Sequence, residues 1–183
     1  IAQRNAIMQG LVTAKDDDVI VISDVDEIPS RETMRILSKG IEKKSRMYLQ
    51  FHYYSLNCQI NWPWHLTIAL PYRLLRQTTP QKARHTVEKG EVDLEKAGWH
   101  FSFFGTNEEI RKKLSCHSEC WMNKPEFVSD ENLNHVRENF LDFAYRPVSL
   151  MRFEPVVNFL PETIKENRGK YEAMGWFHKR KAI

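Results

Sequence analysis

The pattern of apolar positions predicts alternating helices and strands. Val19–Ile22 is a run of four β-branched residues, typical of a strand buried on both faces, as in a parallel sheet. Before it, Ile7, Leu11 and Ala14 recur at helical spacing. A strand buried on both faces needs neighbours, and one helix precedes this strand. We therefore expect the chain to lack at least one βα unit upstream.

The later pattern continues this alternation. It predicts a helix that begins at Ser30, with Met34, Leu37 and Ile41 on its inner face, and then a strand over 47–56. An extended stretch over 66–76, interrupted by Pro71, is followed by a surface loop over 77–96 that could include a short strand. After a strand over 98–104, helices are predicted from Thr106, from near Ser129 and from near Pro161. The order of elements is typical of an α/β fold in one domain, 1–183.

Composition narrows the class of protein. The chain has 183 residues, of which 42% are hydrophobic and 28% charged, as in globular proteins that bury a sizeable core. Its net charge of +3 is small and spread along the chain, so it gives no case for a nucleic-acid partner. No apolar run approaches the roughly 18 residues of a membrane span. We expect neither nucleic-acid binding nor a membrane span in this chain.

The three cysteines do not suggest a disulfide framework. Cys58, Cys116 and Cys120 are an odd number, so they cannot all pair within one chain. Cys116, His117 and Cys120 have a spacing that a zinc site can use, but a second ligand pair is lacking. We interpret these cysteines as free or partly buried thiols.

Three carboxylates follow the first apolar strand within four positions. Asp24, Asp26 and Glu27 come directly after Val19–Ile22, where ligands of open α/β sheets bind. Carboxylates placed there commonly hold a hard cation, and a cation would relieve the repulsion between them. The alternative is that they are loop residues that cap the following helix. For Glu27, the pattern leaves two alternatives open: it supports the residues that hold the cation, or it forms an ion pair with Arg31.

Two motifs together resemble glycosyltransferase family 17. Ser23–Pro29 reads Ser-Asp-Val-Asp-Glu-Ile-Pro, and Ala97–Ser102, about 70 residues later, reads Ala-Gly-Trp-His-Phe-Ser. The similarity continues through Thr106-x-Glu108-x-Ile110, Lys113-Leu114 and Asn132-Leu-Asn134, and more faintly through Tyr145-Arg146 and Leu160-Pro161. It covers most of the chain. This is the family of the β-1,4-mannosyl-glycoprotein 4-β-N-acetylglucosaminyltransferase.

The resemblance implies a fold and a reaction. The family implies a GT-A-like, Rossmann-like α/β fold, a UDP-GlcNAc donor, a glycan acceptor, a divalent metal (Mn²⁺ or Mg²⁺) and inversion at the anomeric carbon. Residues 1–76 would form the donor- and metal-binding half, and 97–160 the acceptor and catalytic half. Two departures matter: we expect the upstream nucleotide-binding part to be missing from this chain, and Cys116–Glu119 differs from the vertebrate enzyme and resembles bacterial-type relatives. The acceptor therefore does not carry over.

The resemblance also suggests roles on the donor side. Asp26 would be a direct metal ligand, Asp24 would orient the ribose or hold metal-bound water, and His100 would complete the metal shell. His100 is equally explained as a core histidine of an apolar strand. Trp99 would stack on a sugar or belong to the core. The arginines that would contact the diphosphate are Arg4, Arg73 and Arg76, and surface ion pairs are their alternative.

Inversion requires a general base for the acceptor hydroxyl. The candidates are Glu119, ranked first, then Glu108, with His117 as a base or as the group that orients Glu119. Glu109 fits a capping box with Thr106, which gives it a structural task. Glu108, in the same helical turn, has the helix dipole as its alternative.

Other functions use parts of the same pattern. In a phosphatase of the haloacid dehalogenase type, Asp24 would be the nucleophile and Asp26 the acid/base, but the later Gly-Asp-x-x-x-Asp-like motif is lacking. An EF-hand would need a glycine and a closing glutamate that this loop lacks. A truncated relative that binds carbohydrate without turnover is the alternative outside the enzymes.

Overall fold

The computed structural model describes residues 2–116, 120–145, 151–153 and 158–177. The chain forms two compact units: residues 1–50 with 63–100, and residues 51–62 with 101–183. Strands β3 (Ser45–Tyr53) and β6 (Val92–Ser102) pass from the first unit into the second.

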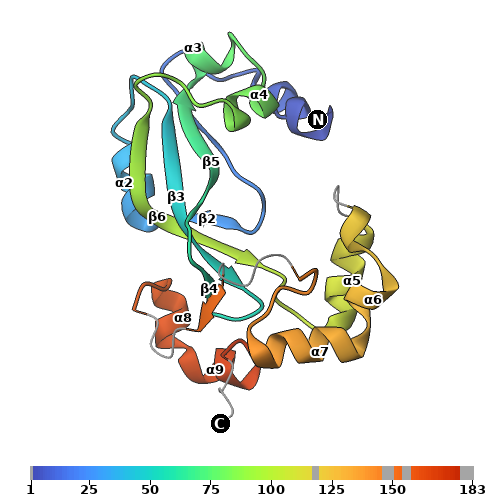
Figure 1. The fold of residues 1–183 in the computed structure, drawn as a ribbon. Helices are drawn as coiled ribbons and strands as arrows, with labels where there is room; N and C mark the ends of the chain where they lie inside the picture. The colour runs from blue at the N-terminus through green and yellow to red at the C-terminus, as the bar shows by residue number, and fades with distance from the viewer. Residues whose placement is uncertain (1, 117–119, 146–150, 154–157, 178–183) are drawn as a thin grey trace. The chain divides into compact units, whose positions relative to one another are not determined.

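The first unit is built on a mixed sheet (Figure 1). Strand β1 (Val19–Ile22) pairs antiparallel with β5 (Trp64–Pro71), β5 pairs antiparallel with β3, and β2 (Glu27–Pro29) pairs antiparallel with β6. Strands β3 and β6 also pair, and they run in the same direction. The Val92 amide donates to the Lys44 carbonyl where they begin, and the Tyr54 amide to the Ser102 carbonyl where they end. The α/β class is confirmed.

The environment of β1 differs in part from the expectation. Its partner β5 is antiparallel, and in the described part of the chain β1 pairs with β5 alone, so Val19, Ile20 and Val21 are half-buried and Ile22 is buried. Apolar side chains nevertheless cover both faces: Ile20 and Ile22 pack in one core cluster, Val19 and Val21 in another. The prediction from the apolar run was therefore correct for burial on both faces and wrong for a parallel partner strand.

Helices cover these two faces. On one side, Ile7, Met8 and Leu11 pack against the cluster that contains Ile22 and Ile68. On the other, Leu37 packs with Met47 and Leu49. The helical segments of this unit are α1 (Ala2–Asn5), η1 (Ala6–Leu11), α2 (Arg31–Leu37), α3 (Tyr72–Leu75) and α4 (Pro80–His85).

Local sequence signals locate several helix starts. Ser30 accepts a hydrogen bond from the Thr33 amide and begins α2, as expected, but Met34 is 44% exposed and is not on the inner face. Segment 77–96, predicted as a loop, contains α4, which Thr79 caps and Pro80 begins. Pro71 ends β5, after which the chain turns into α3.

The second unit has its own core. Leu56, Leu160 and Ile164 form one cluster, and an aromatic group includes Tyr53, Phe103 and Phe143. Strand β4 (Cys58–Ile60) pairs antiparallel with the end of β3 and with β7 (Met151–Phe153). The helical segments are α5 (Asn107–Ser115), η2 (Cys120–Met122), α6 (Pro125–Val128), α7 (Asp130–Asn139), α8 (Glu162–Glu166) and α9 (Arg168–Ala173).

Predicted caps in this unit are confirmed. Thr106 and Glu109 form a reciprocal capping box at α5, and Ser129 caps α7.

Cys58 is a buried free thiol whose burial raises its pKa to about 12, and Cys116 is an exposed free thiol. Among the described residues, no helix has the length and apolar character needed to cross a membrane.

Candidate functional site

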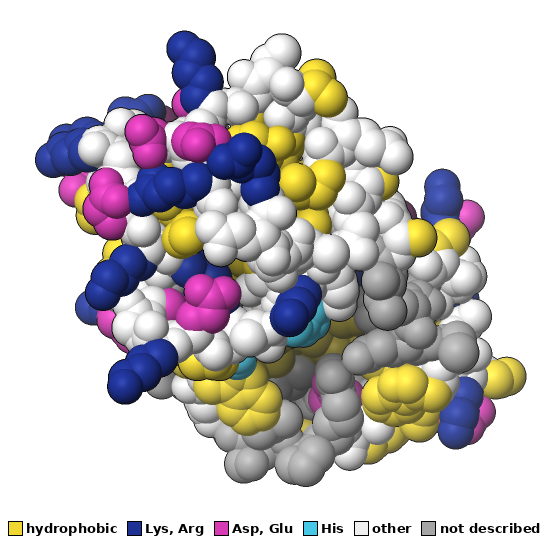
Figure 2. All heavy atoms as spheres, turned by 90° about the horizontal axis from the view of Figure 1, so that it is seen from above, with side chains coloured by type: hydrophobic (Ala, Val, Ile, Leu, Met, Phe, Trp, Pro, Cys, Tyr) yellow, Lys and Arg dark blue, Asp and Glu magenta, His cyan; other side chains and the backbone are white. Residues whose placement is uncertain are grey.

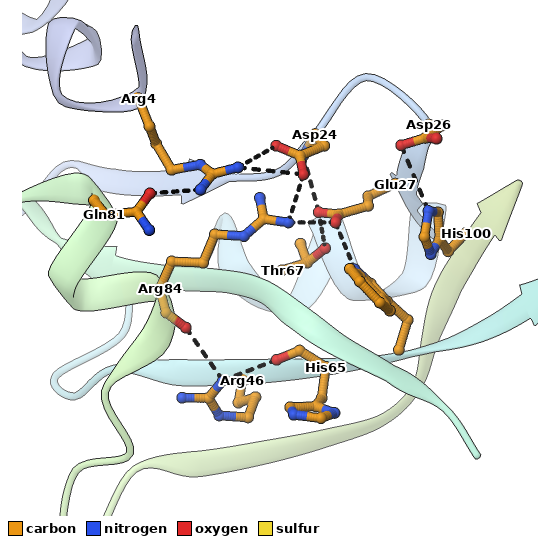
Figure 3. Close-up of polar contacts among 11 residues, drawn as sticks. Arg4, Asp24, Asp26, Glu27, Arg46, His65, Thr67, Gln81, Arg84 and His100 are labelled. Atoms are coloured by element: carbon orange, nitrogen blue, oxygen red, sulfur yellow. Dashed lines mark hydrogen bonds and ion pairs between the residues drawn. The ribbon is translucent and has the colours of Figure 1, made fainter. Parts of the chain in front are cut away.

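The acidic segment after β1 forms a tight turn. The Glu27 amide donates to the Asp24 carbonyl at 3.0 Å, so Val25 and Asp26 occupy the two central positions of a β-turn. Val25 at its tip is fully exposed. Glu27 then begins β2 and lies opposite His100 of β6. The turn aims neighbouring carboxylates in different directions, as Figure 3 shows for Asp24 and Asp26.

Asp24 lies between two arginines. Arg4 Nη2 is 3.1 Å from one carboxylate oxygen, and Arg84 Nη2 is 2.8 Å from the other. Arg4 also donates to Gln81 of α4 at 2.5 Å, which connects the N-terminal helix to this helix. Two guanidinium groups therefore balance the charge of Asp24, and its expected contact with the ribose or with metal-bound water stays a prediction.

Glu27 is the buried centre of this network. Its side chain has no exposed surface, and it accepts from Arg84 Nη2 at 2.5 Å, Trp64 Nε1 at 2.5 Å, Thr67 Oγ1 at 2.7 Å and the Asp24 amide at 2.9 Å. Its partner is thus Arg84 of α4, not Arg31. A buried carboxylate held by four donors fixes the start of β2 and, with it, the turn.

Asp26 lies on the other side of the turn, beside His100. Asp26 Oδ1 is 3.6 Å from His100 Nε2, and the two side chains are 24% and 7% exposed (Figure 3). His100 also packs against the Trp64 ring, with 4.5 Å between ring centroids. An accessible carboxylate next to a positioned imidazole is a pair of ligands that suits Mn²⁺.

The residues at this turn that suit a metal ion are therefore Asp26 and His100. Among the described residues, no three His, Cys, Asp or Glu side chains gather as a metal-binding group. Asp24 is joined to Arg4 and Arg84 instead. With two protein ligands, a bound ion would take its other ligands from water and from an anionic substrate, as Mg²⁺-type sites commonly do.

A second network of buried charges, formed by Lys44, Arg46 and Glu91, contacts the backbone of α4 near Arg84. Lys44, Arg46 and Glu91 have side chains 1%, 3% and 8% exposed. Lys44 Nζ lies 3.0 Å from Glu91 and donates to the Ala83 and Thr86 carbonyls, and Arg46 Nε lies 2.7 Å from Glu91. Arg46 also donates to the Arg84 carbonyl at 3.5 Å. This network fixes the end of α4 against β3.

The electrostatics of Glu91 follow from these contacts. Burial raises the pKa of its carboxyl, but hydrogen bonds from Arg46 and Lys44 outweigh burial and lower it to about 2. On the face that Figure 2 shows, Lys and Arg side chains are interspersed with Asp and Glu rather than gathered in a patch of one sign. This agrees with the small net charge of +3.

The other predicted donor-side residues lie elsewhere. Arg73 pairs with Asp17 and Glu42, and Arg76 pairs with Asp16, so both lie at the opposite end of β1 from Asp24. Trp99 is 8% exposed in β6 and is part of the protein interior. Of the three arginines singled out from the sequence, the structure brings Arg4 to the acidic turn.

The predicted base candidates belong to the second unit. Glu108 is exposed in the first turn of α5. Glu119 and His117 lie outside the described residues. The assignment of the general base stays a prediction.

Arg84, Trp64 and Thr67 were not predicted as site residues. Arg84 lies 57 positions from Glu27, and no local pattern connects them. One signal was available: Thr79-Pro80 is a capping residue followed by proline, which predicts a helix and a fixed position for the residues after it.

Comparison with known proteins identifies the family of this chain. A family model described as glycosyltransferase family 17 matches residues 1–137, which include both motifs and the whole acidic turn. No curated protein matches, and no solved structure matches. The match covers well over half of the sequence and contains the two motifs on which the resemblance was based, while Tyr145-Arg146 and Leu160-Pro161 lie beyond it. The chain therefore belongs to glycosyltransferase family 17.

Proposed function

We propose that this glycosyltransferase transfers N-acetylglucosamine from UDP-GlcNAc to a glycan hydroxyl, with a divalent metal and with inversion at the anomeric carbon. The observation that carries the proposal is Asp26 beside His100 on an exposed turn at the end of β1, within a family 17 chain. The donor sugar comes from the family resemblance, and the ligand pair supports the metal.

Asp26 and His100 would hold the metal ion, Mn²⁺ or Mg²⁺. When bound, the ion neutralises negative charge on the nucleotide diphosphate that leaves. Asp24 and Glu27 take a different part: through Arg84 they hold the turn that presents Asp26. Binding and positioning are thus divided between the carboxylates of one short motif.

Inversion requires one further group from this chain. A base must take the proton of the acceptor hydroxyl while the bond between the anomeric carbon and the diphosphate oxygen breaks. Glu119 with His117, or Glu108, would serve that purpose.

Calorimetric titration of UDP-GlcNAc and of UDP, with Mn²⁺ and with EDTA, tests the proposal. We expect binding with Mn²⁺, its loss in EDTA, and its loss in Asp26→Ala. Asp16→Ala is the matched control, because Asp16 is an exposed carboxylate paired with Arg76 at the other end of β1. Equal binding in EDTA, or in Asp26→Ala, would contradict the metal assignment. If neither nucleotide binds with Mn²⁺, the donor assignment falls.

A further inference from the structure

A hollow in the first unit lies at the same end of the sheet as the acidic turn. It has a volume of about 330 Å³ and is lined by Arg46, Tyr48, His65, Val87, Glu91 and Asp93. Ligand sites range from roughly 300 to 1,000 Å³, so this volume suits one or two small rings. None of its lining residues takes part in the Asp26 and His100 pair.

Strand register places the hollow at the same end of the sheet as Asp24. Ile22 of β1 and Arg46 of β3 both lie opposite Ile68 of β5. From that row, Asp24 lies two residues beyond the end of β1, and Tyr48 is two residues further along β3. His65, three residues before Ile68 on the antiparallel strand β5, lies at this end too. Arg46 joins the two places, because it lines the hollow and donates to the Arg84 carbonyl.

The lining has aromatic and polar parts. The rings of Tyr48 and His65 lie 6.1 Å apart between centroids and are inclined by 31°, which makes a shallow aromatic wall. Val87, 75% exposed, adds an apolar rim. Burial and the nearby charge of Asp93 raise the pKa of the Tyr48 hydroxyl. A carboxylate has about four acceptor positions, so Asp93 keeps capacity for further hydroxyl donors.

Charge selects among the ligands that this lining admits. The exposed carboxylate of Asp93 disfavours a phosphate or another anion, and the charge of Arg46 in the lining is already balanced by Glu91. Glu91 is already paired with Lys44 and Arg46, so it is not available to hold a cation. What remains is a neutral ligand with apolar ring faces and many hydroxyl groups, which describes a sugar ring.

We propose that this hollow is a saccharide subsite, with Tyr48 and His65 contacting the apolar face of a sugar ring and Asp93 accepting from its hydroxyl groups. The assignment of that saccharide as the glycan acceptor rests on the proposed function. Saccharide binding itself rests on the lining.

The test is a titration of the isotopically labelled chain with chitotriose and, separately, mannotriose, followed by nuclear magnetic resonance. We expect at least one trisaccharide to shift the Tyr48, His65 and Asp93 signals. Tyr48→Ala should weaken its binding about five- to tenfold, and Tyr48→Phe, which keeps the ring, by no more than about twofold. Asp93→Asn should weaken it about tenfold. Glu32→Gln, an exposed carboxylate of α2, should leave it unchanged.

Several results would overturn the subsite. They are no shift with either trisaccharide, binding that Tyr48→Ala and Asp93→Asn leave intact, or UDP alone shifting these signals, which would mark a nucleotide site. Failure of the proposed function is separate: there, trisaccharide binds in the hollow but UDP-GlcNAc with Mn²⁺ does not bind. UDP-GlcNAc binding without trisaccharide binding would remove the subsite and leave the donor site in place.

Discussion

Replacing Arg84 by methionine removes the guanidinium that contacts both Glu27 and Asp24. Methionine keeps much of the length and apolar stem of arginine, so the change is mainly one of charge and hydrogen bonding. Glu27 then remains buried as a carboxylate, with Trp64, Thr67 and the Asp24 amide as its donors. We expect the protein to lose stability and the acidic turn to lose its fixed position.

The magnitude follows from burial. The Arg84 and Glu27 side chains are 1% and 0% exposed, and removing one partner of such a pair costs about 3–5 kcal/mol. The three remaining donors still compensate part of the charge, each by about 1 kcal/mol net. We therefore expect a loss of about 3 kcal/mol in the free energy of unfolding, a large part of the roughly 5–15 kcal/mol of an ordinary domain.

Urea unfolding followed by tryptophan fluorescence measures this loss. Arg35→Met is the matched control: Arg35 and its partner Glu32 are 68% and 65% exposed, so its loss should cost less than about 0.5 kcal/mol. The double variant Arg84→Met with Glu27→Gln, which removes the buried charge, should recover at least about 1 kcal/mol. If Arg84→Met costs no more than Arg35→Met, the buried network does not hold the turn and the reasoning is refuted.

Two further predictions concern the frame around the site. Gly98→Ala would place a Cβ 2.2 Å from the Ile28 carbonyl oxygen and 2.8 Å from the Pro29 Cα, both backbone atoms. It should separate β2 from β6, lower stability by about 2 kcal/mol or more, and weaken metal-dependent donor binding, as unfolding and calorimetry would show; Gly10→Ala, with open space around it, is the control. The lowered pKa of Glu91, about 2 against an ordinary 4.5, means that the unfolded chain takes up this proton first as pH falls. Stability from this group is therefore full above pH 4.5 and is lost between about pH 4.5 and 2, by up to about 3 kcal/mol, and Glu91→Gln should flatten that part of a pH series of urea unfolding curves. An unchanged slope in Glu91→Gln would contradict the assignment of this dependence to Glu91.

The parts of the fold that sequence predicts well are those decided by neighbours in the chain. Ser30, Thr106 and Ser129 each cap a helix through the amide three residues on, and such contacts can be predicted from the local sequence. The direction of β1 is different. Four apolar residues report that a strand is covered on both faces, but they hold no information on which strand lies beside it. The partner, β5, begins 42 positions after the end of β1.

The same distinction explains the site. The acidic motif predicts where the candidate site lies, because carboxylates after a buried strand need a source of positive charge. The basic side chain that contacts each carboxylate comes from residues far along the chain. Arg84 contacts Asp24, 60 positions away, and Glu27, 57 positions away. His100 lies near Asp26 because β2 pairs with β6. A motif of three similar residues therefore contains three environments. Asp24 is ion-paired, Glu27 is buried, and Asp26, at the centre of the turn, is the carboxylate with a neighbouring imidazole, which makes it the residue of the motif on which substrate binding should depend most.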